Sequence, residues 1–172
     1  DYLVTLGVNM ADPYGNRVGR ESVVRFSTAP YDPSIVLNTR GIVGTYSAYS
    51  DSRVFATYRN VSEIGLDLYR MPLSDFARYT GRRSFEFRDT YIPAAENLMR
   101  SWSLPVEFFL NENAFAEIEL REGGGRLDPD LYFLRIQTPY GDSDHLLSVA
   151  DANLTLKTGF EGVLVWATDQ QS

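Results

Sequence analysis

The stretch RVFATYRNVSEIGLDLYRM, residues 53–71, decides the fold class. Apolar side chains occupy every second position in both of its halves, which is the period of a β-strand with one buried face. The side chains predicted to face inward are Val54, Ala56, Tyr58, Ile64, Leu66 and Leu68. The residues between the halves, NVSE at 60–63, are typical of a hairpin turn, so we predict two strands joined by that turn.

The same alternation recurs along most of the chain. Further runs of this kind, separated by Gly, Pro, Asn and Asp, cover residues 2–8, 22–28, 34–41, 114–122, 131–138, 145–158 and 162–169. The run at 145–158 is long enough for a bent or two-part strand. Short strands at regular spacing indicate two sheets packed face to face. We therefore predict an all-β protein built on an antiparallel β-sandwich.

Residues 73–103 differ from this pattern and predict a helical insertion. PLSDFARYTG, residues 72–81, suits a short helix that Ser74 caps and Gly81 ends. YIPAAENLMRSW, residues 91–102, places apolar side chains at helical spacing and predicts a second, better helix. We expect the apolar stripe of that helix to pack onto one end of a sheet.

Proline and aspartate interrupt the strand pattern in APYDPS, residues 29–34, and predict a short, stiff linker. Before the linker, residues 1–28 read as a complete hairpin whose turn includes DPYGN at 12–16. The last strand, at 162–169, has no partner strand downstream. Because strand edges without partners seek others, we expect residues 1–28 and 161–168 to pair with each other, with the sandwich or with a second molecule.

The composition excludes several classes of function. The 172 residues carry a net charge of −7, from 23 acidic and 16 basic residues, which argues against nucleic acid and against an anionic membrane surface as partners. No apolar run is long enough to span a bilayer, so we expect no membrane insertion. The chain has no cysteine, which removes disulfides, thiolate metal sites and cysteine nucleophiles. We expect no cofactor and no metal site.

His145 is the only histidine, so any histidine-dependent site has to include it. It follows Asp142, Ser143 and Asp144 in YGDSDH, which suggests a catalytic or metal-binding cluster. The members of a catalytic triad converge from separate positions, whereas these neighbours share one turn. We therefore predict a solvated hairpin turn and no catalytic residue.

Carboxylates elsewhere offer further candidate sites. Asp12 with Asn16, and the DSD turn, supply oxygen ligands of the kind that calcium takes, but neither has the spacing of an EF-hand loop. Glu117 and Glu119 share one face of a strand whose other face is apolar. We expect both glutamates to be solvated rather than to work as an acid–base pair.

The sequence contains one basic cluster, which consists of Arg78, Arg82, Arg83 and Arg88. Its interleaved aromatic residues faintly resemble a patch for single-stranded nucleic acid, and its charge suits an acidic protein partner. The acidity of the whole chain instead favours a charged loop with its own salt bridges. The sequence leaves the ligand of such a cluster open.

Three further motifs have structural explanations. GGG at 123–125 lacks the Lys-Ser/Thr of a phosphate-binding loop and predicts a flexible connection. Trp102 and Trp166 are expected in the core or against another domain. Asn60 and Asn153 begin acceptor patterns for N-glycosylation, which matter only in a eukaryotic secretory route.

Several stretches resemble bacterial α2-macroglobulin-like proteins. The stretches are VFATYRNVSEIGLDLYRM at 54–71, LDPDLYFLRIQTP at 127–139 and ADANLTLKTGFEGVLVWATD at 150–169, and the central region is similar to a macroglobulin-type domain near the N-terminus of such proteins. DPYGNRVGRESVVRFSTAP, residues 12–30, resembles the closing hairpin of a bacterial Ig-like domain.

This resemblance implies a fragment with three parts. They are the C-terminal hairpin of an Ig-like domain with its linker at 1–32, a macroglobulin-type (Ig-like) β-sandwich at 33–157 that contains the helical insertion at about 73–103, and the truncated first strand of a following domain at 158–172. Such proteins trap proteases, many of them with a thioester that needs cysteine, and this chain has no cysteine and no long bait-like stretch.

The resemblance therefore implies a non-catalytic structural module of a longer protein. That protein would be extracellular or periplasmic, with a lipid anchor elsewhere in the parent chain as one option. The module's partners would be the neighbouring domains, and proteases only through the full-length protein.

Two other functions stay open at this point. One is a cell-surface adhesion or ligand-binding module on an Ig-like sandwich, and the other is an accessory domain that binds carbohydrate. A solvent-facing platform of aromatic side chains would favour sugar binding, and their burial would favour a scaffold. The side chains that decide are Tyr46, Tyr49, Tyr58, Tyr69 and Phe133.

Overall fold

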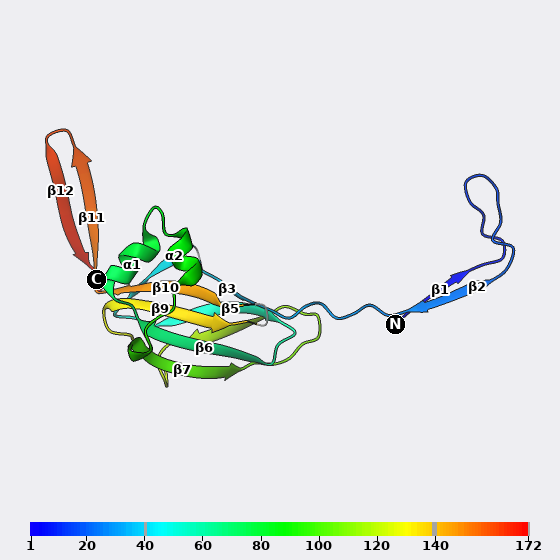
Figure 1. Ribbon diagram of the computed structural model, residues 1–172, viewed down its shortest axis with the longest axis horizontal. Helices are drawn as coiled ribbons and strands as arrows, with labels where there is room; N and C mark the ends of the chain where they lie inside the picture. Colours follow the sequence, from blue (N-terminus) through cyan, green and yellow to red (C-terminus); the bar gives the residue numbers. More distant parts are fainter. Residues whose placement is uncertain (40, 139–140, 172) are drawn as a thin grey trace. The chain divides into compact units, whose positions relative to one another are not determined.

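The computed structural model describes residues 1–39, 41–138 and 141–171. The chain divides into two compact units, Asp1–Tyr31 and Asp32–Ser172. Strands dominate both units, and the helices belong to one segment of the second (Figure 1). Among the described residues, no helix is long and apolar enough to cross a membrane.

The first unit is the β-hairpin that the sequence predicts. Strands β1 (Tyr2–Leu6) and β2 (Ser22–Phe26) pair antiparallel, and the rings of Tyr2 and Phe26 stack with their centroids 5.3 Å apart. In the turn, Gly15 has a φ of 90°, a conformation that glycine adopts without steric cost. Apolar side chains of both strands stay exposed.

The second unit contains the predicted two-layer β-sandwich. Its larger sheet has the strand order β4-β10-β9-β6-β7, and its smaller sheet has the order β3-β5-β8. The bounds are β3 (Ser34–Leu37), β4 (Val43–Ser47), β5 (Arg53–Arg59), β6 (Glu63–Arg70), β7 (Leu98–Pro105), β8 (Ala114–Glu119), β9 (Asp130–Gln137) and β10 (Ser143–Ala150). The pairs within it are antiparallel except that of β4 with β10, which is parallel, and β4 is a strand that the alternation did not predict.

The two sheets bury the alternate apolar side chains between them. Ile64, Leu66 and Leu68 of β6 are at most 1% exposed. They meet the inward side chains of β5, β8, β9 and β10 in one continuous core. The inward faces predicted from alternation are therefore confirmed for both halves of the stretch at 53–71.

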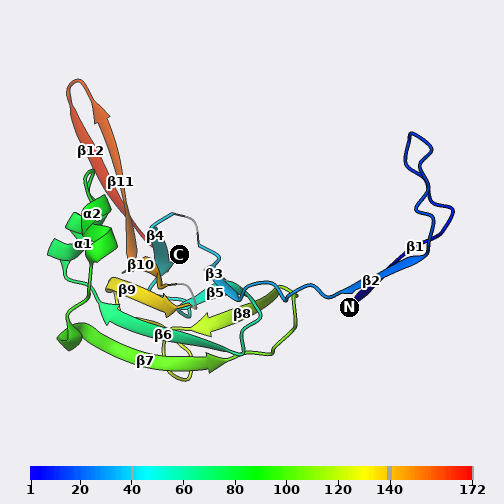
Figure 2. The same cartoon turned by 45° about the vertical axis from the view of Figure 1, so that its right-hand side comes forward.

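The predicted hairpin between β5 and β6 is wrong. The two strands belong to different sheets, so the turn after β5 carries the chain from one layer to the other (Figure 2). Asn60 makes this turn with a φ of 54°, and its Oδ1 accepts a hydrogen bond of 2.6 Å from the main-chain N–H of Asn111. Alternation identifies a strand and its buried face, but it does not identify the strand's partner.

Short helices cover the other face of the five-stranded sheet. Figure 1 shows α1 (Leu73–Thr80) and α2 (Phe85–Thr90) together, and the 3₁₀ turn η1 (Ala95–Asn97) follows them; we call residues 72–97 the helical cap. Tyr79 and Tyr91 of the cap pack edge-on against Phe133 of β9, with ring centroids 5.8 and 5.2 Å away. Phe133 is fully buried as a result, although it points away from the core between the sheets.

Helix α1 ends where predicted and begins without the predicted cap. Gly81 is its C-terminal flanking residue. Pro72 stands at the N-cap position, and the carbonyl oxygen of Pro72 accepts main-chain hydrogen bonds from Asp75 and Phe76. Ser74 lies inside the first turn, so its hydroxyl does not cap the helix.

The predicted helix over residues 91–102 is wrong, and the helical cap is shorter than expected. Residues 98–105 form β7, which pairs antiparallel with β6. Trp102 and Leu104 pack against the core, and Ser101 and Ser103 alternate with them on the exposed side. Pairing with β6 satisfies the main-chain groups of this segment and buries its two large side chains, which outweighs the helical spacing of its first half.

Residues 152–169 form a second hairpin. The predicted long strand divides at Asp151 into β10 and β11 (Ala152–Gly159), and β11 pairs along its full length with β12 (Gly162–Asp169). The strand at 162–169 therefore finds its partner upstream. All residues of both strands are exposed, and the predicted boundary at residue 157 falls inside β11.

Leu134→Ala tests the central position of β9. Leu134 is 0% exposed, so we expect the substitution to lower the free energy of unfolding by about 2–5 kcal/mol, measured by urea denaturation. Phe115→Ala is the control, because Phe115 is 75% exposed on the outer face of β8, and its effect should stay within about 0.5 kcal/mol. Equal losses for the two variants would show that β9 is not the centre of the core.

Candidate functional site

The structure places His145 inside β10, where it is 2% exposed, and not in the solvated turn that we predicted. Its Nε2 lies 3.1 Å from Oη of Tyr46 on β4, within hydrogen-bond distance. A Cβ on Gly44 would come within 2.8 Å of the same nitrogen, so this glycine leaves room for the imidazole. The turn prediction failed because β10 already begins at Ser143, and His145 pairs with Leu134 of β9.

The acidic residues next to His145 are directed elsewhere. Asp144 accepts a hydrogen bond of 3.1 Å from Nε of Arg135. The same nitrogen lies 3.4 Å from a carboxylate oxygen of Asp142. Successive residues of a strand point to opposite faces, so the Asp144 carboxylate and the imidazole are separated by the sheet. Residues 139–140 of the predicted turn lie outside the described residues.

Burial governs the pKa values around this strand. Desolvation lowers the pKa of His145 and raises that of Tyr46, so both rings are uncharged near pH 7. Desolvation also raises the pKa of Asp144, and the ion pair with Arg135 opposes that rise. Burial raises the pKa of Tyr91 to about 12. A neutral imidazole beside a neutral phenol is a packed polar pair, which supplies no activated nucleophile.

The candidate calcium ligands at Asp12 are occupied by hydrogen bonds within the turn. Asp12 Oδ1 accepts hydrogen bonds of 2.9 Å from the main-chain N–H groups of Tyr14 and Asn16, and Oδ2 accepts one of 2.8 Å from the Asn16 amide. The bonds from Asn16 lower the pKa of Asp12. Within the ranges that the structure describes, no group of three His, Cys, Asp or Glu residues could hold a metal ion.

Glu117 and Glu119 point outward from β8, as predicted. Glu117 forms an ion pair with Arg53 on the neighbouring strand, and Arg53 also lies 3.5 Å from Asp51. These side chains are about half exposed, so the ion pairs contribute little to stability. Neither glutamate lies in the buried surroundings that a general acid needs.

The basic cluster does not form the salt bridges that we predicted. Within the described ranges, none of its four arginines has a carboxylate oxygen within 4.0 Å, in contrast to Arg53, Arg70 and Arg135. Arg78 instead stacks over the ring of Phe87, with its guanidinium carbon 4.1 Å from the ring centroid. The acidic residues of the helical cap do not reach the guanidinium groups of Arg78, Arg82, Arg83 and Arg88.

The aromatic side chains that would build a sugar-binding platform do not build one. Tyr58 and Phe133 are buried, and Tyr46, Tyr49 and Tyr69 are half-buried. Tyr58 and Phe133 also lie in different hydrophobic clusters, one between the sheets and one under the helical cap. The burial favours a scaffold over a carbohydrate-binding surface.

The two tryptophans differ in their surroundings. Trp102 packs against the core from β7, as expected, and the guanidinium of Arg100 lies 4.0 Å from its ring centroid. Trp166 is 43% exposed on β12, so its contact with another domain stays a prediction. Of the two glycosylation acceptors, Asn60 holds a hydrogen bond with Asn111.

The glycines at 123–125 form an ordered loop, which the sequence did not predict. These glycines have φ values of 71°, 79° and 100°, which side chains with a Cβ rarely adopt. Ser52, 3% exposed, holds both ends of the loop. Its carbonyl oxygen accepts a hydrogen bond from the N–H of Leu120, its Oγ accepts one from the N–H of Leu127, and its own N–H donates to the carbonyl oxygen of Gly125. The predicted flexible connection is therefore a clamped turn.

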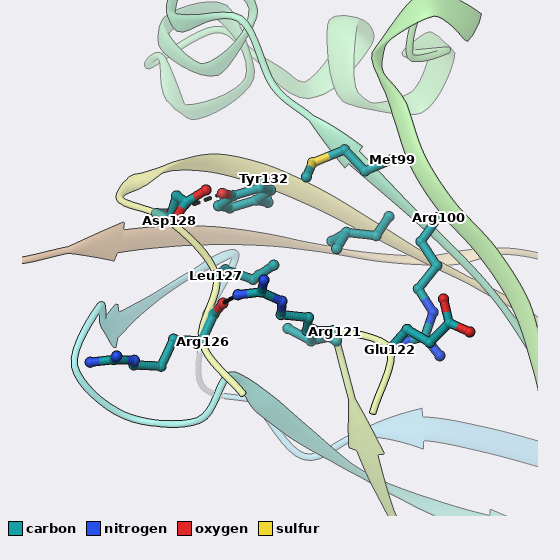
Figure 3. A pocket seen from close by; sticks show the side chains of 10 residues that line it. Met99, Arg100, Arg121, Glu122, Arg126, Leu127, Asp128 and Tyr132 are labelled. Atoms are coloured by element: carbon teal, nitrogen blue, oxygen red, sulfur yellow. Dashed lines mark hydrogen bonds between the residues drawn. The ribbon is translucent and has the colours of Figure 1, made fainter. Parts of the chain in front are cut away.

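The residues on both sides of this loop line a cavity of about 280 Å³ where β7 begins and β8 ends. Figure 3 shows the side chains that line it. The cavity has an apolar floor whose members are at most 7% exposed, and a charged rim. The floor consists of Leu68, Leu120, Leu127 and Tyr132, and the rim of Met99, Arg100, Arg121, Glu122, Arg126 and Asp128. Tyr132 Oη donates a hydrogen bond of 2.9 Å to the carbonyl oxygen of Asp128, which fixes one side of the floor.

Two arginines of the rim are held by main-chain oxygens. Arg121 Nη1 donates to the carbonyl oxygen of Arg126 at 2.8 Å, and Arg100 Nη1 donates to that of Glu119 at 2.9 Å. Figure 3 shows the Arg121 side chain extended toward Leu127, whereas the Arg126 side chain points away. Within the described part of the chain, neither Arg100 nor Arg121 has a carboxylate oxygen within 4.0 Å.

A second hollow, of about 400 Å³, adjoins the cavity and shares Arg100 with it. Its lining comes from β7 and β8, which are each an edge strand of one of the two sheets. The remaining lining residues are Trp102, Ser103, Leu104, Glu117 and Glu119. We call the cavity and this hollow together the β7 groove. Of the candidate residues from the sequence, the groove contains Trp102, Glu117 and Glu119, whereas its arginines, Arg100, Arg121 and Arg126, were not among them.

Neither a family model nor a curated protein matches the chain. Solved structures do match it. Native alpha-2-macroglobulin from Escherichia coli spanning domains MG0-NIE-MG1 covers 98% of this chain at 10% identity with a TM-score of 0.63, and the chain covers 56% of that structure. A Salmonella alpha-2-macroglobulin mutant covers 97% at 10% identity with a TM-score of 0.67, and the chain covers 10% of it.

A third match, the Escherichia coli protein spanning domains NIE-MG1, covers 81% of this chain at 9% identity with a TM-score of 0.51, and the chain covers 70% of it. At these identities the likeness is one of fold. The chain thus has the all-β fold of a segment of bacterial alpha-2-macroglobulins, and it spans about half of the length of the first structure and a tenth of the second.

His145→Gln should change how the stability of the chain depends on pH. Burial lowers the pKa of His145, so below about pH 6.5 the unfolded chain binds a proton that the folded chain resists, and stability falls with pH. The variant lacks this contribution. Thermal unfolding is measured for the unmodified chain and the variant from about pH 8 to pH 5. The difference between their unfolding midpoints should be constant above neutral pH. Below about pH 6.5 the midpoint of the unmodified chain should fall more than that of the variant. Parallel curves over the whole range would contradict the burial of a neutral imidazole.

Proposed function

We propose that the chain is a non-catalytic structural module of an α2-macroglobulin-like, protease-trapping protein. The observation that carries this proposal is the match of 97–98% of the chain to multidomain bacterial alpha-2-macroglobulin structures. The match runs across both compact units, so it involves more than a common sandwich. In this view the chain positions its neighbours, and the trapping of a protease belongs to the whole protein.

The two structures from Escherichia coli suggest a domain assignment. The one that includes MG0 covers more of this chain than the one that lacks it, and the difference is close to the share of the chain in Asp1–Tyr31. We therefore assign the first hairpin, with the linker to residue 32, to an MG0-like domain and the sandwich to an NIE-like domain. The hairpin at 152–169 begins the following MG1-like domain, which moves the expected boundary from 157 to Asp151.

Both hairpins have the surface expected of strands that belong to neighbouring domains. Apolar side chains on both faces of β11 and β12 are exposed, among them Leu154, Leu156, Val165 and Trp166 at 43–73%. The hairpin of β1 and β2 shows the same feature, with Leu3 at 59%. Exposed apolar surface of this kind marks a protein–protein contact, so neighbouring domains are the first partners of this module.

A non-catalytic role agrees with the state of the titratable groups. The His145 imidazole is buried against Tyr46, Asp144 is paired with Arg135, and Glu117 is paired with Arg53 on the surface. Engaged groups of this kind hold a fold together and do not activate a nucleophile. We further propose an extracellular or periplasmic location, with proteases met only through the full-length protein and no role for nucleic acid.

The alternative, a module for adhesion or carbohydrate binding, has less support. Its discriminating feature was an exposed platform of tyrosines, and those side chains are buried or half-buried. The solved structures that match the chain point to alpha-2-macroglobulins and give no support to an adhesin.

Protease protection assays test the proposed function. The complete gene product that contains this chain is incubated with trypsin, and cleavage of casein and of a small chromogenic peptide are compared. We expect casein cleavage to fall while peptide cleavage persists, because a trapped protease still reaches small substrates. Residues 1–172 alone should change neither rate.

A matched deletion completes this test. Removal of residues 33–151 from the gene product should reduce the casein protection if the sandwich positions its neighbours. A complete gene product that leaves casein cleavage unchanged, or a chain that cleaves a substrate by itself, would refute the proposed function.

A further inference from the structure

We propose that the β7 groove binds an extended peptide segment, which adds a strand to the outer edge of β7 and carries an acidic residue next to a large apolar one. The apolar side chain enters the cavity under the glycine loop, and the carboxylate binds Arg121 with help from Arg100. This inference rests on the groove alone and holds whether or not the chain serves a protease trap.

The outer edge of β7 is available for main-chain hydrogen bonds. Among the described residues, β7 pairs with β6 and with no strand on its other side. Natural edge strands are usually blocked by lysines, prolines, bulges or a covering element. Here the register with β6 shifts between Leu68 and Tyr69, which leaves Met99 near the start of β7 without a partner on β6, and the one proline is Pro105, where the strand ends. The residues between them leave a regular edge of the kind to which a peptide strand can be added.

The cavity is large enough for an apolar side chain. Pockets for drug-sized ligands measure about 300–1,000 Å³, and this one measures about 280 Å³. Its floor is apolar and buried, so a large apolar side chain would gain hydrophobic stabilisation there. One large side chain of a strand lying on β7 would fit within this volume. Met99 and Arg100 of β7 line the same cavity, which places the strand edge beside it.

The charge of the rim selects an acidic neighbour for that side chain. A guanidinium has five N–H donors, and Arg121 and Arg100 each use one on a main-chain oxygen. Their remaining donors have no carboxylate partner within the described residues. A carboxylate is the group that guanidinium geometry binds best in a peptide. Both side chains are already held in place, which reduces the entropy lost on binding.

The same rim disfavours a polyanion. Glu122 and Asp128 also line the cavity, so a chain of phosphates would meet carboxylates next to the arginines. Nucleic acids and anionic membranes need a concentrated positive surface, which this groove does not have. A peptide with one carboxylate can bind the guanidinium of Arg121, and its main chain can form hydrogen bonds with the edge of β7. Neither a nucleic acid nor a membrane can form both contacts.

The clamp at Ser52 is what keeps the site formed without a ligand. Its three hydrogen bonds fix the strand end that carries Arg121 and the segment that carries Leu127. The groove is therefore preformed, and binding should leave the backbone of the glycine loop unchanged.

A selection from a library of random heptapeptides displayed on phage tests the proposal. Residues 1–172 are the bait, and the Arg121→Gln variant of the same chain is the counter-bait. We expect the peptides enriched on the unmodified chain to carry Asp or Glu adjacent to Leu, Ile or Phe. Loss of the charge at Arg121 should weaken the strongest synthetic peptide at least about tenfold, as for one charged hydrogen bond.

Arg82→Gln is the matched control, because it removes the same charge from an exposed arginine of the helical cap. It should bind the peptide like the unmodified chain. Failure of the selection to enrich any peptide over the counter-bait, enrichment without an acidic residue, or equal weakening by both substitutions would each overturn the proposal.

N-methylated peptides test strand addition separately. Main-chain N–H groups of an added strand alternate between β7 and solvent. Methylation at one set of alternate positions should therefore abolish binding, and methylation at the other set should be tolerated. Amide chemical shifts of the chain on titration with the parent peptide should change along β7 and in the glycine loop. Equal tolerance at all positions, or shift changes confined to the helical cap, would contradict addition of a strand to β7.

Discussion

The burial of β9 on both faces is the constraint on which the second unit depends. Tyr132, Leu134 and Ile136 face the smaller sheet and Phe133 faces the helical cap, and all four are 0% exposed. A strand in this position needs a sheet on one side and another cover on the other. The short helices provide that second cover through the rings packed on Phe133. The helical cap is therefore required to bury β9.

Because the centre of the sheet is buried, the groups that can contact other molecules lie at its edges. The titratable groups near the middle, His145 and Asp144, are desolvated and engaged with Tyr46 and Arg135, and they hold strands together. The edge strands β7 and β8 instead leave main-chain groups, a small apolar cavity and arginines on one side of the sandwich. Among the described residues, Arg100 and Arg121 have no carboxylate within 4.0 Å. This arrangement agrees with the proposed role of a module that contacts neighbouring domains.

The sequence was sufficient to predict strands, their buried faces and the sandwich, because a period of two reports directly on which side chains are buried. It could not predict strand partners, so β5 and β6 were joined in a hairpin although they lie in different sheets. The helix predicted over residues 91–102 failed for a related reason. The stabilisation from pairing with β6 depends on residues outside the segment, so the segment's own pattern does not report it.

The candidate site depended even more on tertiary contacts. Three glycines in a row predicted a flexible connection, because the clamp at Ser52 and the assembly of Arg100 with Arg121 come from positions far apart in the chain. His145 was misplaced because its acidic neighbours resemble a turn, and only the pairing with β9 shows that the strand has already begun.

Native-state hydrogen exchange tests the central role of β9 most directly. The account predicts that the amides of β9 exchange only through global unfolding, while those of α1, α2 and β7 exchange through smaller openings. Faster exchange in β9 than in these outer elements would contradict it.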